Sequence, residues 1–572
     1  MAKQYDKEKE QILLKQGINR LLARLIAQRN IPLEKINAFL EPNHILIPHP
    51  YELQDMEKAS KIFCDMALAK KKVAVIGDYD ADGIISSTMI KELCKEFDLE
   101  CFVFLPSRFE HGYGLSEKSL EGFSKFISQY YIPDLLFVLD CGSSNEKEIQ
   151  QLKKMGISKI IIIDHHITND DNISKSADAL VNWHMSNHDE MCTCGEVYQF
   201  IRSLRIHTKK INPIEFLTYA ALGTIGDVMP INGINRIIVK NGLTPYAIEH
   251  LSGHGLAALL TDSKINLNKV TQSDIAFKIV PKINAPGRMT DPYLAYYLFT
   301  EKEQTKTNQI VQQLSKLNKK RKVLQKQIEK EAMTIVKNNP DEYQHGALLF
   351  KPEWATGITG IVAAKISEKI HKPVIMAGQQ NDQIKGSGRA PMGFDLEKIL
   401  ENCKDLFLQY GGHKLAAGVI LNPKKIEIAN KEFNKVCLEH AKQYVNDSNI
   451  NQYDAELKCS TISLETAKML IDNLYPYCNQ FNEEPIFLIS NVHITEAELF
   501  EPQGWKILKF TCKKYGDEIP FGFIMFTDKY GSEISGWNAD IYFKFPQRDY
   551  FNNYGKYELM AMDIVNKNQN DL

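Results

Sequence analysis

Four short runs of apolar residues constrain the fold of this chain more than any other feature. They are separated by stretches of helical periodicity and occupy residues 73–76, 102–105, 135–139 and 160–163. Runs of this length with few charges suit strands that are buried on both faces of a parallel sheet. Because helical stretches alternate with these strands, the pattern predicts a doubly wound α/β domain.

Other parts of the chain differ in pattern from this region. Residues 8–40 have helical periodicity and precede a Pro-rich connector. Residues 301–338 are poor in Gly and Pro and rich in Lys, Gln, Glu and Leu, which predicts one long charged helix. A second α/β pattern follows, with apolar runs at residues 347–350 and 374–376. From about residue 450 onward, aromatic and β-branched residues in short alternating runs predict a small β-barrel.

A chain of 572 residues is too long for one hydrophobic core, so several domains are expected. We predict an α/β multidomain protein with five parts. They are an N-terminal helical segment (1–55), a parallel-sheet catalytic domain (56–300), a connecting helix (301–338), a second α/β domain (339–448) and a C-terminal β-barrel domain (449–572).

Composition limits the partners and the location of the protein. The chain has 69 Lys+Arg against 71 Asp+Glu, so a nucleic-acid partner would need a local basic groove. The N-terminus lacks the apolar core of a signal peptide, and no uncharged apolar run is long enough to cross a membrane. The eleven cysteines are scattered, which indicates reduced thiols. We therefore predict a cytoplasmic protein without membrane contact.

The acidic segment that follows the first apolar run is the most informative one. It places Asp78, Asp80 and Asp82 at alternate positions, followed by Gly83. In open α/β sheets, ligands bind at the carboxyl ends of the strands. Three carboxylates so close together repel one another unless a cation lies between them, and hard divalent cations such as Mg²⁺ or Mn²⁺ suit such oxygen ligands. An acidic solvated turn is the alternative interpretation of this segment by itself.

Three further apolar stretches end in the same manner. Asp140 follows the third run, the triplet Asp164-His165-His166 follows the fourth, and Asp227 follows another apolar stretch at residues 220–225. One such residue could be a strand cap or a hydrogen-bonded histidine, but four sets on the same edge of one sheet favour a metal cluster. The number of ligands fits two ions with Asp140 as the bridge, and two divalent ions a few ångströms apart suit phosphoryl transfer.

These four sets of residues resemble the motifs of the DHH phosphoesterase superfamily. Four further segments are similar, in order and spacing, to those of the RecJ family within it. They are His111-Gly112-Tyr113-Gly114-Leu115, Asn284-Ala285-Pro286-Gly287-Arg288, Lys385-Gly386-Ser387-Gly388-Arg389 and Gly411-Gly412-His413-Lys414-Leu415-Ala416-Ala417-Gly418. The resemblance runs from about residue 10 to the end of the chain. Among its few departures, Ala355 stands where a histidine is common in the family.

The resemblance assigns site residues by position. It implies two ions, Mn²⁺ or Mg²⁺, with Asp78, Asp80 and Asp140 at the first. The second would be held by Asp82, Asp140, His165 and Asp227. His166 would hold His165 or donate to a phosphate oxygen. The implied substrate-binding residues are Arg108, Tyr113, Arg288, Ser387, Arg389 and His413, with the arginines on phosphates and Tyr113 stacked on a terminal base.

The resemblance also implies a function. It predicts a single-stranded-DNA-specific exonuclease of DNA repair and recombination, which digests 5′ to 3′ and acts as a monomer. A single-strand-binding protein and a helicase are implied partners. The C-terminal barrel would be an OB-fold that holds the strand. Its candidate contacts are Trp505, Lys506, Lys509, Lys513, Lys514 and Trp537.

Three alternatives remain beside this prediction. A superfamily member that cleaves short oligonucleotides or cyclic dinucleotides would share the motifs but would not need the barrel. A pyrophosphatase would need neither the barrel nor a base-stacking tyrosine. A non-catalytic replication scaffold would have lost metal ligands, whereas every expected ligand is present here.

Overall fold

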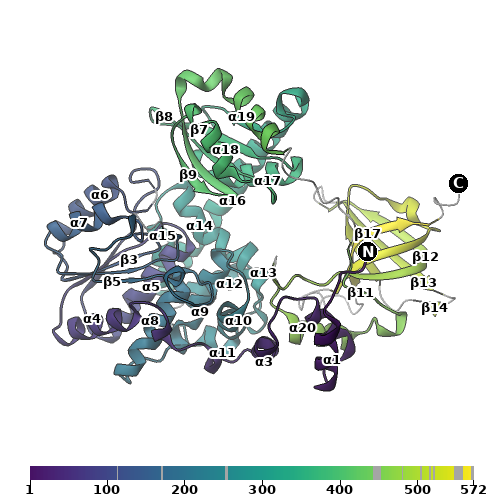
Figure 1. Cartoon of the computed structure of the whole chain (residues 1–572), viewed down its shortest axis with the longest axis horizontal. Helices are drawn as coiled ribbons and strands as arrows, with labels where there is room; N and C mark the ends of the chain where they lie inside the picture. Colours follow the sequence, from purple (N-terminus) through teal and green to yellow (C-terminus); the bar gives the residue numbers. More distant parts are fainter. Residues whose placement is uncertain are drawn as a thin grey trace. The chain divides into compact units, whose positions relative to one another are not determined.

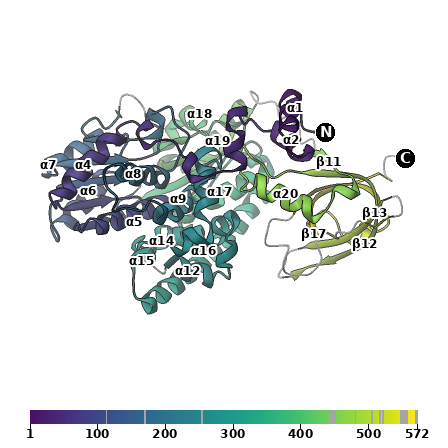
Figure 2. The ribbon, with the colours of Figure 1, turned by 90° about the horizontal axis from the view of Figure 1, so that it is seen from below.

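The computed structural model spans 572 residues and is shown in Figures 1 and 2. The residues that it describes are 1–112, 114–168, 172–251, 255–441, 452–478, 481–502, 506–514, 517–518, 522–545 and 558–567. Within these ranges, none of the helices has the length and apolar character needed to span a bilayer. All eleven cysteines are free, which agrees with the predicted reduced thiols.

The chain forms two compact units. The first, unit 1, comprises Met1–Phe104, Gly114–Val280 and Ile450–Leu572. The second, unit 2, comprises Leu105–Tyr113 and Pro281–Asn449.

A five-stranded parallel sheet forms the centre of unit 1 and confirms the predicted fold of this region. Its order is β2-β1-β3-β4-β5. The strands are β1 (Val73–Ile76), β2 (Cys101–Phe104), β3 (Leu135–Leu139), β4 (Lys159–Ile163) and β5 (Ala179–Val181). The residues of β1 and β3 are buried throughout, because helices cover both faces of the sheet.

Helices pack on both faces of this sheet. On one face, the ring of Phe63 in α4 (Met56–Leu68) and that of Phe200 in α8 (Thr193–His207) lie 6.1 and 5.6 Å from the ring of Phe137 in β3. α5 (Ala81–Glu96) packs against α8. On the other face, α6 (Glu117–Ile127) and α7 (Glu146–Lys154) bury side chains such as Phe123 and Leu152 against β2, β3 and β4.

Asp227 lies outside this sheet, so the prediction that it follows a strand on the same edge is wrong. The apolar stretch before it belongs to α9 (Ile214–Gly226), and Asp227 is the residue that caps the end of this helix. A short apolar run does not distinguish a buried helix from a buried strand. The helices that follow are α10 (Gly233–Gly242), α11 (Pro245–Glu249), α12 (Gly255–Asp262), α13 (Gln272–Asp274), the π-helix Ile275–Ile279, α14 (Val280–Met289) and α15 (Tyr293–Thr300).

The C-terminal strands of unit 1 pair in a closed ring. The sheet order is β11-β12-β16-β17-β15-β13-β14, and an additional β12–β13 pairing joins the two sides. The elements are β11 (Ala455–Glu456), α20 (Leu464–Leu474), β12 (Phe487–Phe500), β13 (Ile507–Lys514), β14 (Asp517–Glu518), β15 (Gly522–Phe526), β16 (Asn538–Lys544) and β17 (Glu558–Asn566).

The N-terminal helices belong to the same hydrophobic core as these C-terminal strands. Residues 8–40 form α1 (Lys7–Lys15), α2 (Arg20–Ala27) and α3 (Ile36–Leu40), and Gly17 adopts a positive φ of 82° between the first two. Leu13 and Leu25 are buried in one cluster with Phe487 and Phe510 of the ring. Figure 2 shows α1 and α2 beside α20 and β11.

Unit 2 contains the long helix and a mixed sheet. α16 (Gln304–Asn338) is one helix of 35 residues within the range predicted from composition. The sheet has the order β6-β7-β8-β10-β9, with only β6 and β7 parallel. Its elements are β6 (Ala347–Phe350), α17 (Thr356–Ile370), β7 (Val374–Gln380), β8 (Gln383–Arg389), α18 (Leu396–Asn402), β9 (Phe407–His413), β10 (Ala416–Leu421) and α19 (Ile426–Ala441).

Candidate active site

The predicted metal ligands gather at the carboxyl end of the parallel sheet. β1 and β3 are neighbours in the sheet, and the chain leaves them toward opposite sides, since β1 leads to β2 and β3 leads to β4. Such a reversal of strand order creates a crevice in which doubly wound sheets bind their ligands. Asp78 and Asp80 follow β1, Asp140 follows β3, and His165 follows β4.

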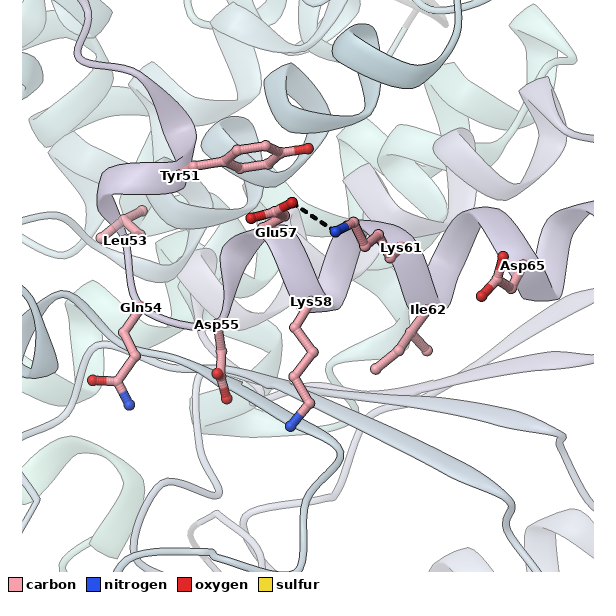
Figure 3. A pocket seen from close by; sticks show the side chains of 9 residues that line it. All are labelled: Tyr51, Leu53, Gln54, Asp55, Glu57, Lys58, Lys61, Ile62 and Asp65. Atoms are coloured by element: carbon pink, nitrogen blue, oxygen red, sulfur yellow. Dashed lines mark ion pairs between the residues drawn. The ribbon is translucent and has the colours of Figure 1, made fainter.

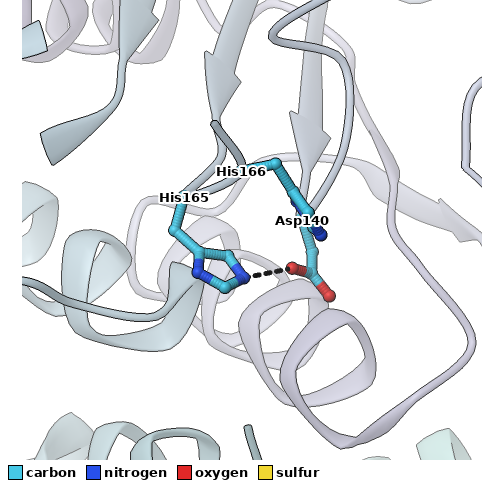
Figure 4. Close-up of side chains that lie close together, drawn as sticks. All are labelled: Asp140, His165 and His166. Carbon is cyan, nitrogen blue, oxygen red and sulfur yellow. Dashed lines mark ion pairs between the residues drawn. The ribbon is translucent and has the colours of Figure 1, made fainter. Parts of the chain in front are cut away.

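Asp140 belongs to two groups of side chains that could each hold a metal ion. One group is Asp78, Asp80 and Asp140, and the other is Asp140, His165 and His166, with the ligand atoms of each group within 4.8 Å of one another. The Nε2 atom of His165 lies 3.4 Å from Oδ1 of Asp140 and 3.6 Å from Oδ2 of Asp227. Figure 4 shows the ring of His165 directed toward Asp140.

Local backbone geometry brings these carboxylates together. The side chain of Asp80 accepts hydrogen bonds from the backbone N–H groups of Asp82 (3.0 Å) and Gly83 (3.3 Å) and thereby caps α5. A Cβ atom at Gly83 would lie 2.5 Å from the backbone nitrogen of Asp78, so only glycine allows this close approach. Asp140 has a φ of 61°, a left-handed conformation that is costly for most side chains and frequent at functional sites.

Mutual repulsion perturbs the carboxylates of Asp78, Asp80, Asp82, Asp140 and Asp227, which we call the acidic cluster. Burial, followed by the charges of Asp82, Asp80, Asp78 and Asp227, raises the pKa of Asp140 well above its usual value. Burial and the charges of Asp82 and Asp80 raise the pKa of Asp227 in the same way. A divalent cation would relieve this repulsion. Carboxylate oxygens with one imidazole form a donor set that fits Mn²⁺ or Mg²⁺.

His166 is held by the first residue of its own triplet. Its Nδ1 atom lies 2.7 Å from Oδ1 of Asp164, whose other oxygen accepts a hydrogen bond from the backbone N–H of Ser143 at 2.9 Å. Burial opposes the charged ring, but the hydrogen bond and the charge of Asp164 outweigh it and raise the pKa of His166 to about 9. His166 is therefore suited to donate to an anion, in line with one of its two predicted roles.

Asp82 lies close to Asp140 and is also engaged by α8. Its carboxylate oxygens accept hydrogen bonds from the backbone N–H groups of Thr193 (2.8 Å) and Cys194 (2.9 Å), at the start of that helix. A Cβ atom at Gly223 would lie 2.6 Å from Oδ1 of Asp82, so α9 also approaches this carboxylate closely. Thr193 was missed by sequence reasoning, although its hydroxyl also donates to Asp140 at 3.2 Å. No sequence signal connects it to residues so distant in the chain.

This geometry gives a first prediction. Asp82→Ala removes the cap of the first turn of α8, a loss of about 1–2 kcal/mol in the free energy of unfolding, which the relief of its repulsion with Asp140 and Asp227 partly offsets. The rise in melting temperature on adding Mn²⁺ should persist in this variant, whereas Asp78→Ala should abolish it. Thermal unfolding with and without Mn²⁺ measures both effects. Loss of the Mn²⁺-induced rise in Asp82→Ala would instead support the role of Asp82 as a ligand.

The predicted substrate-binding residues that the structure describes all belong to unit 2. Ser387 and Arg389 lie on β8, and the register pairs Arg389 with Ala416, which pairs in turn with His413. Residues in register point to the same face of a sheet, as do residues two apart on one strand, so these three side chains share a face. Tyr113 lies outside the described residues.

Part of this face is open because its strands carry glycine. Cβ atoms placed at Gly411 and Gly418 would meet nothing within 4 Å. The guanidinium of Arg389 is largely buried, and burial together with the positive charge of Arg108 lowers its pKa. Two neighbouring guanidinium groups beside an open strip are suited to bind phosphate.

A separate surface pocket of about 490 Å³ lies beside α4 (Figure 3). It is lined by side chains of both charges, and Lys61 pairs with Glu57 at 2.6 Å one turn away on the same helix. The predicted site residues are all absent from its lining. The acidic cluster is therefore the candidate active site, and this pocket is separate from it.

Comparisons with known proteins agree with the resemblance seen in the sequence. The model of the DHH family, N-terminal domain, matches residues 72–224, and the DHHA1 domain matches residues 341–439. The chain therefore contains a DHH domain and a DHHA1 domain. The first match contains β1 to β5 with the acidic cluster, except Asp227, and the second contains the sheet with Ser387, Arg389 and His413.

The chain is also similar to RecJ proteins over most of its length. It is 28% identical to the single-stranded-DNA-specific exonuclease RecJ of Haemophilus influenzae over 79% of this chain and 80% of the relative. A crystal structure of RecJ from Thermus thermophilus in complex with Mn²⁺ matches with a TM-score of 0.80 and 22% identity, covering 98% of this chain and 78% of the other. A structure of exonuclease RecJ bound to manganese matches with a TM-score of 0.60 and 26% identity, covering 70% and 98%.

Proposed function

We propose that this protein is a metal-dependent exonuclease that is specific for single-stranded DNA and digests it 5′ to 3′. The observation that carries the proposal is the position of Asp140 in two ligand groups at the carboxyl end of the sheet. Relatives named as single-stranded-DNA-specific exonucleases align over about four fifths of the chain, which supports the choice of substrate.

Five residues are our candidates for holding the metal ions. They are Asp78, Asp80, Asp140, His165 and Asp227. Two bound ions, Mn²⁺ or Mg²⁺, would lower the pKa of a water nucleophile and neutralise charge on the phosphoryl group. Asp82 takes the role of a positioning residue in this proposal, since α8 engages both of its oxygens.

Other side chains would act on the phosphates themselves. His166, whose pKa is raised by Asp164, would donate a hydrogen bond to a phosphate oxygen. In unit 2, Arg108, Arg288, Ser387, Arg389 and His413 would bind the backbone of the strand. Arginine suits this task because its planar fork matches two phosphate oxygens.

The C-terminal strands would hold the single strand outside the catalytic cluster. Their ring follows the order β12-β13-β15-β17-β16 and back to β12, with β15 and β17 parallel. This order supports an OB-fold, a small barrel that binds single strands through basic and aromatic surfaces. Trp505, one of the aromatic candidates, lies outside the described residues. A single-strand-binding protein and a helicase remain the expected partners.

One assay tests the proposed function. Single- and double-stranded oligonucleotides labelled at either end, and linear and circular single strands of equal length, are incubated with Mn²⁺, with Mg²⁺ or with EDTA. Release of label from the 5′ end of linear single strands, only with a divalent ion, is the expected result. Cleavage of circles at the rate of linear strands would contradict an exonuclease, and preference for duplexes would contradict the substrate.

The role of the C-terminal strands gives a second prediction. Lys513→Ala and Lys514→Ala, both on β13, are expected to weaken binding of long single strands and to flatten its salt dependence. Removing one lysine–phosphate interaction should reduce the slope of log K against log[salt] by about 0.7. Fluorescence anisotropy with labelled oligonucleotides at several salt concentrations measures this. Lys147→Ala, on the exposed surface of α7, is the matched control and should leave the slope unchanged.

A further inference from the structure

Val228 is the residue next to Asp227, and its conformation is unusual for its type. It has a φ of 57°, and the residue is 85% exposed. A β-branched residue with a left-handed backbone is a genuine outlier, because its branched side chain crowds the backbone. Since the side chain is exposed, packing within the described structure does not offset the strain.

The hydrogen bonds around Val228 define the position that it occupies. Its N–H donates to the carbonyl of Ile225 at 3.2 Å, and the N–H of Met229 donates to that of Thr224 at 3.1 Å. These two bonds form the Schellman motif that ends α9, and Val228 occupies the left-handed position at which glycine is the usual residue. The motif by itself therefore gives no reason for valine at this place.

At residues other than glycine, the same motif recurs three times in the described part of unit 1, which allows a comparison. Lys70, Asp98 and Lys264 follow α4, α5 and α12 with φ values of 51°, 54° and 57° and the same pair of hydrogen bonds. These three residues are polar and unbranched at Cβ, and none of them adjoins a proposed metal ligand. Val228 is the only one of the four that is β-branched and that neighbours the acidic cluster.

From this contrast we infer that Val228 is a substrate-contacting residue, whose side chain packs against the sugar and base of the nucleotide held at the acidic cluster. The inference rests on the proposed function and adds a specificity-determining residue to it. Adjacent Cα atoms are about 3.8 Å apart, so the exposed Val228 is within reach of a nucleotide whose phosphate binds at Asp227. The deoxyribose next to that phosphate presents carbon atoms, which an apolar side chain can bury.

The strain makes the test specific, because activity and stability should change in opposite directions. Val228→Gly removes the side chain and relieves the backbone, so its melting temperature is expected to rise by about 2–4 °C. Its kcat/KM on single-stranded DNA should fall at least about tenfold, which corresponds to the free energy of partly burying a valine side chain. The rise in melting temperature caused by Mn²⁺ should be retained, since Asp227 is unchanged.

Two further variants test whether the apolar side chain itself is responsible. Lys264→Gly relieves the same backbone conformation in α12 and should raise the melting temperature without changing kcat/KM. Val228→Asn tolerates the left-handed conformation and has a similar size but a polar surface. Val228→Asn should lose activity as Val228→Gly does, because the apolar contact is lost in both variants. Retained activity in Val228→Asn would show that the rigidity of the loop, and not the apolar side chain, is responsible.

The outcomes distinguish this inference from the proposed function. Wild-type protein without nuclease activity would overturn the proposed function, and this inference with it. Active wild-type protein with unchanged kcat/KM in Val228→Gly, or in Val228→Asn, would overturn the inference alone. Loss of the Mn²⁺ effect in Val228→Gly would also overturn it, because the valine would then act through the metal ligands.

Discussion

Asp140→Asn is expected to reduce kcat for single-strand cleavage by about 10²–10⁴-fold. Asp140 is the residue shared by both ligand groups, and the transition-state charge that a metal ion stabilises is worth several kcal/mol. Asparagine has nearly the same shape and tolerates the φ of 61°, so the fold should survive. Cleavage of a labelled oligonucleotide at saturating Mn²⁺ measures the effect.

The same variant should gain stability in EDTA. The raised pKa of Asp140 means that the charged carboxylate is disfavoured in the folded protein. The protonated form stabilises the fold at low pH, and this stabilisation is lost as the pH rises through the raised pKa. The neutral amide removes the repulsion, and the melting temperature without metal should rise while the effect of Mn²⁺ disappears. Asp65→Asn, on the exposed surface of α4, is the control and should change neither activity nor the Mn²⁺ effect. Near-normal cleavage by Asp140→Asn would refute the assignment of Asp140 as a ligand shared by both metal-binding groups.

Arg236→Met is expected to cost about 3–5 kcal/mol of stability in unit 1, because it removes the donor of a buried hydrogen-bond network. The guanidinium on α10 is 1% exposed and donates to the backbone carbonyls of Phe39, Asn473, Leu474, Tyr475 and Pro476 at 2.9–3.1 Å. Burial lowers its pKa to about 10, so it stays charged at neutral pH. It also lies 4.1 Å from the ring centroid of Phe39.

Two of these five carbonyls keep another donor when Arg236 is removed. The amide of Asn482 donates to Leu474 and Pro476 at 2.6 and 2.9 Å, so Phe39, Asn473 and Tyr475 lose their side-chain donor. Thermal unfolding and limited proteolysis between α20 and β12 measure the loss. Lys240→Ala is the matched control, because Lys240 on the same helix donates to Asp472 in an exposed position. An equal effect of both variants would show that burial of the guanidinium contributes nothing.

Local pattern was sufficient for four of the five strands of the parallel sheet, whereas β5 was not predicted. The limits of β1 and β3 agree with the predicted runs, because an apolar run between charged segments has few other places to be buried. Asp227 was placed on a sheet edge because six apolar residues fit a helix as well as a strand. The helical pattern of residues 8–40 did not reveal that Gly17 separates α1 from α2.

The sequence by itself determined the chemistry of this protein, because residue types and their spacing after apolar runs place acids and histidines at the ends of buried strands. Only the tertiary structure decided which of these side chains meet. Asp82 is turned toward Thr193, 111 positions away, while Asp140 faces His165 on the neighbouring strand connection. The carbonyls around Arg236 likewise depend on the folded chain. Such contacts join residues far apart in the chain, so no local pattern encodes them.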